Sequence, residues 1–208
     1  MAITATENTN LHWNYFIALE QDLEHLSRYI EFCTPNLGVY SIELAHLLFA
    51  AASEVDVLAK CICKQVAPPE PREKITHYRA VLTNASNIPD TFKPLSETEI
   101  FVPRYGLRFT PWENWAQASN PNPYWWSGYN QVKHERNEHF EKANLLNALN
   151  AMGALLIMNV FYYRLKFCPD LTRCYPPKSV TSQLQPETVL LRLPDQYYLA
   201  TYLKNTFG

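Results

Sequence analysis

ANLLNALNAMGALLIMNVFYY, residues 143–163, is the stretch that decides the fold of this chain. It runs for 21 residues without a formal charge, which is about the length of a bilayer span. Amide side chains are costly in hydrocarbon unless each finds a partner, and four asparagines recur in this stretch: Asn144, Asn147, Asn150 and Asn159. We therefore expect no membrane span, and we predict the central helix of a soluble bundle, touched by neighbours on most sides.

The residues before this stretch extend the same helix toward the N-terminus. Pro123 suits the first turn of a helix and Asn122 suits its cap, so we predict one long helix over residues 124–164. Its first half is polar, whereas from Leu145 onward a regular apolar stripe faces the core. The polar half is expected to emerge from the bundle at its tryptophan-rich end.

Three further helices are predicted from apolar spacing and from helix-breaking residues. Apolar residues spaced three and four apart predict a helix over residues 11–32. Ser41 is a suitable N-cap for a second helix, residues 41–66, with Glu43 near its positive end. A shorter third helix is expected over residues 72–84. The predicted fold class is mainly all-α, a bundle of four to five helices.

Two proline-rich regions interrupt the helical pattern. Residues 86–122 form an inserted region rich in Trp and Pro, in which Ile100–Val102 and Leu107–Phe109 predict a small β-hairpin. Residues 168–208 form a Pro-rich C-terminal extension that is expected to pack on the bundle. A chain of 208 residues is long enough for one hydrophobic core and short for two, so residues 1–208 are expected to form a single helical domain.

Composition excludes several classes of protein. Apolar residues make up 47% of the chain and charged residues 18%, which supports a folded core and excludes global disorder. The formal net charge of −2 gives no overall basic field, so a nucleic-acid site would have to be a local patch. The sequence has no Gly-rich phosphate loop, Gly-x-Ser-x-Gly or His-Glu-x-x-His, and we expect no cofactor.

The cysteines indicate a reducing compartment. Their number is odd, and the first ten residues lack the apolar run of a secretory signal. Neither closely spaced pair has the two-residue spacing that is usual for zinc ligands. We therefore expect a cytoplasmic protein without a metal and with five free thiols, Cys33, Cys61, Cys63, Cys168 and Cys174.

Four of the five tryptophans lie within 15 residues, around the end of the insertion. Two interpretations are open. The tryptophans can fix the insertion to the bundle, or they can form a platform on which bases of single-stranded nucleic acid stack, with Arg104 and Arg108 beside them. The four residues are Trp112, Trp115, Trp125 and Trp126.

The main candidate for a functional site is the polar segment of residues 130–139. Successive residues of a helix are about 100° apart, so on a straight helix Asn130, His134 and Asn137 share one face and Arg136 points to the other side. Such a run is also typical of a solvated helix face with i,i+4 pairs. A plain surface and a functional site both remain open.

At Tyr129-Asn130-Gln131-Val132-Lys133-His134 the sequence resembles the HEPN superfamily of small helical domains that bind nucleotides or RNA. The hallmark of that superfamily is Arg-Asn or another polar pair, a few residues and then His, on a late helix of a four- or five-helix bundle. Asn130 and His134 match this hallmark, whereas Tyr129 stands in the place of the arginine. The resemblance extends to the order of the helices.

The resemblance implies a metal-independent endoribonuclease of a toxin or phage-defence type. His134 would transfer a proton to or from the attacking 2′-hydroxyl or the leaving oxygen. Asn130 would orient the histidine or the ribose, and Arg136 would stabilise charge on the phosphate. Further substrate contacts are expected from Lys133, Asn137, Glu54, Arg104 and Arg108.

The resemblance also implies a homodimer, because paired motifs of two protomers meet at an interface in such families. RNA or a nucleotide is the expected ligand, and a protein partner or antitoxin is a further candidate. The alternative is a non-catalytic module that binds nucleotide, RNA or protein, with the missing arginine marking lost catalysis. A catalytic His134 should reach solvent in a positive cleft, whereas a structural one should be buried with both nitrogens satisfied.

Overall fold

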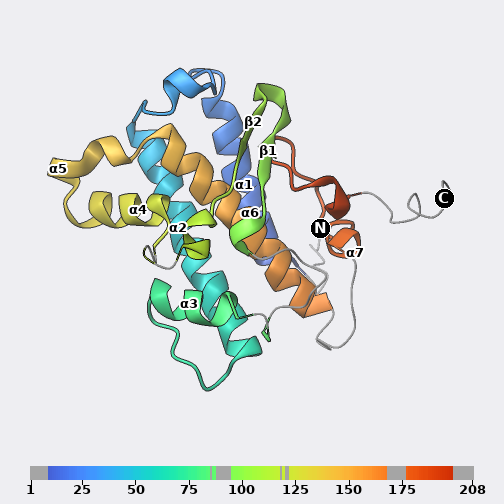
Figure 1. Cartoon of the computed structure of the whole chain (residues 1–208). Helices are drawn as coiled ribbons and strands as arrows, with labels where there is room; N and C mark the ends of the chain where they lie inside the picture. The colour runs from blue at the N-terminus through green and yellow to red at the C-terminus, as the bar shows by residue number, and fades with distance from the viewer. Residues whose placement is uncertain are drawn as a thin grey trace, which may run out of the picture.

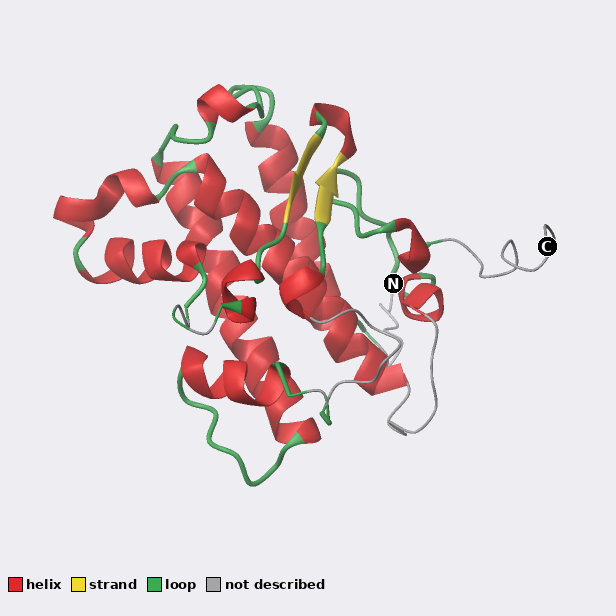
Figure 2. Ribbon diagram, viewed as in Figure 1, coloured by secondary structure: helices red, strands yellow, loops and turns green. Residues whose placement is uncertain are grey.

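The computed structural model describes residues 9–84, 86–87, 95–117, 119, 122–167 and 177–198. Over these residues the protein is mainly helical, with seven α-helices and one two-stranded sheet (Figure 1, Figure 2). The prediction of a mainly all-α fold is confirmed. The helices are α1 Leu11–Leu26, α2 Ile42–Val66, α3 Ile75–Leu82, α4 Tyr124–His134, α5 Arg136–His139, α6 Leu145–Phe167 and α7 Pro177–Thr181.

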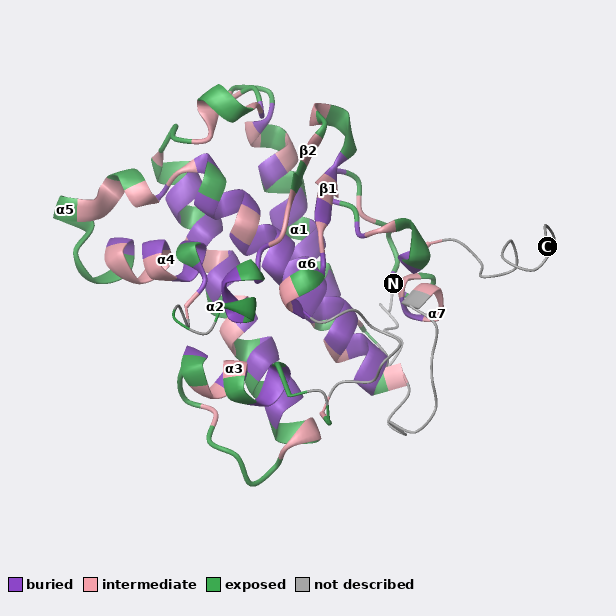
Figure 3. Ribbon diagram, viewed as in Figure 1, coloured by how far each residue is buried: buried purple, intermediate pink, exposed green. Residues whose placement is uncertain are grey.

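Helices α2 and α6 form the centre of the bundle (Figure 1). α6 also contacts α1, α4 and α7, and α2 also contacts α1, α3 and α4. Most of α6 is buried (Figure 3). Among the described helices, α6 alone has the length and composition of a membrane span, and 83% of its most apolar window lies inside the protein. Its apolar sequence is therefore that of the core helix of a soluble bundle.

The sequence predicts the boundaries of α2 well and those of α1 less well. The hydroxyl of Ser41 accepts the N–H of Leu44 at 3.1 Å, which is the expected N-cap bond. α1 ends at Leu26 and not near residue 32. Beyond Leu26 the hydroxyl of Ser27 donates to the carbonyl of Glu24 at 2.6 Å, and side-chain bonds of this kind compete with helical backbone bonds.

The prediction of one helix over residues 124–164 is wrong. The backbone leaves the helical region at Glu135, with φ −135° and ψ 46°, and the chain folds back through α5 before α6 begins. α4 therefore packs against α2 and α6, and α5 projects from one side of the bundle (Figure 1). The side chain of Asn144 accepts the N–H of Asn147 at 3.0 Å. This N-cap bond starts a separate helix at Leu145.

The start of α4 also differs from the prediction. Pro123, and not Asn122, occupies the N-cap position, and no side chain of that residue caps the helix. The N–H of Tyr124 instead donates to the side chain of Asn114 at 3.2 Å. A residue of the insertion thus supplies the bond that was expected from Asn122.

The predicted β-hairpin is confirmed residue by residue. β1 (Ile100–Val102) pairs antiparallel with β2 (Leu107–Phe109), and Gly106 closes the turn with a φ of 63° that favours glycine. The hairpin packs closely on α6, because a Cβ at Gly153 would lie 2.7 Å from the ring of Phe109.

The described C-terminal segment, residues 177–198, is tied to the bundle by a buried carboxylate. Glu20 of α1 is 2% exposed and accepts the backbone N–H groups of Val189, Leu190 and Leu191 at 2.8 to 3.0 Å. Burial raises the pKa of Glu20 above its usual value, although these three bonds oppose the shift.

Three of the cysteines lie in the described part of the chain and are free thiols, as predicted: Cys33, Cys61 and Cys63. The predictions for Cys168 and Cys174 fall outside the described residues.

Cys61 and Cys63 should differ in reactivity toward an alkylating reagent. Cys61 is exposed, whereas Cys63 is fully buried and burial raises its pKa to about 11. The thiolate is the nucleophile, so near neutral pH the folded protein should label Cys61 about a hundredfold faster. Peptide mapping by mass spectrometry after timed iodoacetamide treatment measures both rates. Denaturant should equalise them, and equal rates in the folded protein would contradict the burial of Cys63.

Candidate functional site

The predicted polar site lies on the projecting hairpin formed by α4 and α5 (Figure 1). His134 is the last residue of α4 and is exposed, as are Lys133, Arg136 and Asn137. Asn130 lies one turn before His134 and is half-buried. His134 is therefore open to solvent and is not a buried structural histidine.

The bend at Glu135 changes which residues can act together. Asn130 and His134 share a face of α4, as predicted. Asn137 lies beyond the bend in α5, so the predicted face that it shares with them on one straight helix is not formed. Arg136 also lies beyond the bend, so the prediction that it points away from His134, which assumed one straight helix, no longer applies.

Two cations of this hairpin lie over aromatic rings. The ammonium of Lys133 is 5.4 Å from the centroid of the Tyr129 ring, and the guanidinium carbon of Arg136 is 5.0 Å from that of Phe140. Tyr129 packs edge-on against Phe49 of α2, with centroids 5.8 Å apart. The cations are thus positioned by rings that are themselves anchored to the bundle.

The hairpin carries no net positive charge of its own. Residues 130–142 contain three lysines or arginines and three glutamates, with two histidines. A phosphate group approaching one protomer therefore meets mixed charges. A strongly positive cleft would need cations from outside the hairpin, because a second copy of the hairpin brings as many acids as cations.

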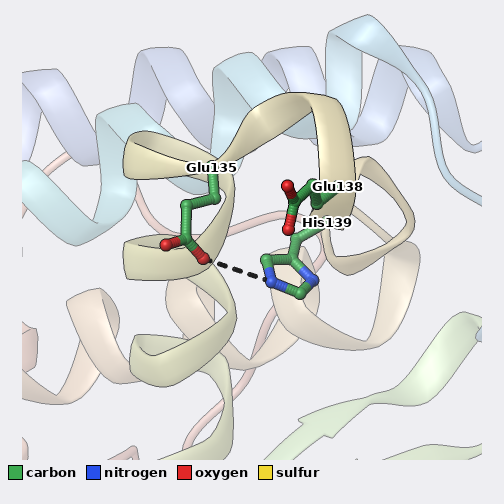
Figure 4. Close-up of side chains that lie close together, drawn as sticks. All are labelled: Glu135, Glu138 and His139. Atoms are coloured by element: carbon green, nitrogen blue, oxygen red, sulfur yellow. Dashed lines mark ion pairs between the residues drawn. The ribbon is translucent and has the colours of Figure 1, made fainter.

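Glu135, Glu138 and His139 gather on the outer turn (Figure 4). One ligand atom from each lies within 4.8 Å of the others, which makes this the group in the described chain that could hold a metal ion. His139 Nε2 lies 3.3 Å from a carboxylate oxygen of Glu135. Both glutamates are exposed, and an i,i+4 ion pair accounts for the arrangement without an ion.

Glu54 does not join this site, contrary to the prediction. Its carboxylate accepts a hydrogen bond of 2.5 Å from His12 Nδ1 of α1, and both side chains are largely buried. On α2, Ala45 and Phe49 pack in one cluster with Val132 of α4. Glu54 lies five residues beyond Phe49 and nine beyond Ala45, or about 8 and 13 Å of helix.

Arg104 and Arg108 are also separated from His134. Both belong to the β-hairpin region, which lies on the opposite side of the bundle from α5 (Figure 1). Arg104 is 3.8 Å from Glu24 of α1. Arg108 is exposed and lines a hollow of about 520 Å³ together with Arg192. The predicted contacts of Arg104 and Arg108 with the substrate stay a prediction.

The tryptophans do not form a stacking platform. All four tryptophans are at most 7% exposed: Trp112, Trp115, Trp125 and Trp126. The ring of Trp112 contacts those of Trp115 and Trp125, and the ring of Trp125 also contacts that of Trp126. The indole N–H of Trp125 donates to the carbonyl of Pro111 at 2.8 Å. The interpretation that the tryptophans fix the insertion to the bundle is confirmed, because rings buried among each other cannot stack on bases.

No family model, curated protein or solved structure matches this chain in comparisons with known proteins.

Proposed function

We propose that the α4–α5 hairpin is an RNA-directed site and that the protein is a metal-independent endoribonuclease of the HEPN-like kind. The observation that carries this proposal is the exposed imidazole of His134 at the end of α4, between Lys133 and the bend that leads to Arg136. Asn130, one turn earlier, is placed to orient the histidine or the ribose.

In this reaction the 2′-hydroxyl of the RNA attacks the adjacent phosphorus. The new O2′–P bond forms while the P–O5′ bond breaks, which leaves a 2′,3′-cyclic phosphate and a 5′-hydroxyl. His134 takes the proton from O2′ or delivers one to O5′, depending on its protonation state. Lys133 and Arg136 offset the charge that builds up on the phosphate oxygens.

The resemblance supports a homodimer, because paired motifs of two protomers meet at an interface in such families. Although two hairpins together have no net positive charge, their meeting would let an arginine or lysine of one protomer reach a phosphate held by the other. We place this dimer in the cytoplasm, as an enzyme of a toxin or phage-defence type controlled by a protein partner such as an antitoxin.

A binding module is the second candidate, and Tyr129 in the place of the motif arginine favours it. Incubating the purified protein with mixed RNA in EDTA separates the two. Fragments that end in a cyclic phosphate support the nuclease. Intact RNA that stays bound supports the module, and RNA that is neither cut nor bound contradicts both.

The cations of the hairpin should set the salt dependence of RNA binding. We expect Lys133→Gln and Arg136→Gln each to lower the slope of log affinity against log salt by about 0.7, because each lost phosphate contact releases one fewer counterion. Fluorescence anisotropy with a labelled single strand measures the slope. Lys64→Gln, an exposed lysine near the end of α2, should leave it unchanged. If neither hairpin variant changes the slope of log affinity against log salt, RNA does not bind at this surface.

A further inference from the structure

A cavity of about 200 Å³ lies between α1, α6 and the C-terminal segment 177–198. Five buried apolar residues from these three parts line it: Trp13, Leu156, Val160, Leu184 and Leu193. The indole N–H of Trp13 donates to the carbonyl of Pro186 at 2.9 Å. The one polar group of the indole is thus already satisfied, and this part of the cavity offers apolar surface.

The polar part of the cavity has an excess of positive charge. The cations Lys178 and Arg192 and one acid, Glu187, line the cavity. The hydroxyls of Thr188 and Tyr198 add neutral hydrogen-bonding groups. Two cations and one carboxylate leave one positive charge that is not balanced within the lining, at the edge of an apolar interior.

Arg192 is held in place by contacts that leave its charge available. Its backbone is hydrogen-bonded in both directions to Phe101 of β1, at 2.8 Å each. Its guanidinium carbon lies 4.4 Å from the centroid of the Tyr198 ring, and the Tyr198 hydroxyl accepts the N–H of Leu193 at 3.0 Å. Its ion pair with Asp195 is 3.7 Å long and solvent-exposed, so the pair is weak.

We propose that this cavity binds a small carboxylate with a compact apolar body. An engineered protein cavity of about 150 Å³ admits benzene, so this one has room for a benzene-sized body that carries one acid group. The buried lining fits the apolar body, and Lys178 and Arg192 fit the carboxylate. One unbalanced positive charge favours a singly charged anion over a doubly charged phosphate.

Benzoate is the probe that tests this proposal. At constant ionic strength, benzoate in the millimolar range should raise the melting temperature of the full-length protein saturably, and titration calorimetry should show one site. Benzyl alcohol matches its shape without the charge and should bind about tenfold more weakly, as should acetate, which lacks the ring. Phenyl phosphate tests the preference for one charge and should bind more weakly than benzoate.

Two variants locate the binding. Lys178→Gln and Arg192→Gln should each weaken benzoate binding about tenfold, while Lys64→Gln should leave it unchanged. The melting temperature without ligand shows whether each variant is folded. If Arg192→Gln does not fold, Lys178→Gln alone tests the proposal. Absence of saturable binding, equal binding of benzyl alcohol, or full affinity in a folded Lys178→Gln variant would each overturn the proposal.

Discussion

Replacing Glu20 with alanine should cost more stability than replacing any other charged residue of α1. The carboxylate accepts three backbone N–H groups from residues 189–191, and two of those bonds are buried. Without it, the N–H groups of Leu190 and Leu191 lose their acceptor where water does not easily replace it. An unsatisfied buried donor costs about 1 to 3 kcal/mol, so the free energy of unfolding should fall by roughly 3 kcal/mol.

Urea unfolding followed by circular dichroism measures this loss, and amide hydrogen exchange locates it. The exchange rate should rise most at the amides of residues 189–191, because Glu20 ties the C-terminal segment to α1. Glu24→Ala is the matched control one turn along the same helix, since the ion pair of Glu24 with Arg104 is exposed and 3.8 Å long. The control should cost at most about 0.5 kcal/mol, and a similar small loss for Glu20→Ala would show that the three bonds contribute little.

Glu20→Gln tests the charge of the same group. Burial raises the pKa of Glu20 in the folded protein above the usual 4.5, so the folded protein holds a proton on this carboxyl more tightly than the unfolded chain does. The part of the stability that depends on protonation of Glu20 is then complete below the usual carboxyl range and is lost as pH rises through the raised pKa, whereas the three hydrogen bonds remain. The free energy of unfolding of wild type, relative to that of Glu20→Gln, should fall as pH rises over that window. If it rises instead, the pKa of Glu20 is lowered in the folded protein and not raised.

Local sequence patterns predicted the elements whose causes are local. The Ser41 cap, the β-hairpin and the core stripe of α6 depend on residues close together in the chain. The break at Glu135 was not predicted, because the polar residues on both sides of it are compatible with a helix. The overlooked signal was Asn144 with Asn147, which we interpreted as two amides within a helix and which forms an N-cap bond.

The candidate site shows the same division. The sequence places Asn130 and His134 one turn apart, and α4 keeps that relation. Contacts between distant elements could not be predicted. His12 and Glu54 are 42 residues apart and pair only because α1 packs on α2, and nothing in the spacing of either residue indicates the other. The sequence therefore predicts Glu54 only as a substrate contact, whereas its pairing with His12 depends on the packing of the two helices.

His134 and His12 should give opposite results when each is replaced by alanine. His134 is exposed at the end of α4, so His134→Ala should change the free energy of unfolding by at most about 0.5 kcal/mol. If the proposed nuclease is correct, the same change should abolish RNA cleavage in EDTA, because a proton-transfer group contributes to the transition state and not to the core. Asn130→Ala should slow cleavage less.

His12→Ala should instead lower stability and leave the chemical step intact. It removes the partner of Glu54, whose side chain is 15% exposed, and the edge-on contact of the imidazole with Tyr162. We expect a loss of roughly 2 kcal/mol, as for other buried hydrogen-bonded groups. Cleavage at a temperature where both variants are folded, beside thermal unfolding of each, measures the contrast. If His134→Ala loses about 2 kcal/mol or more, or cleaves RNA at the wild-type rate, His134 is not the proton-transfer residue.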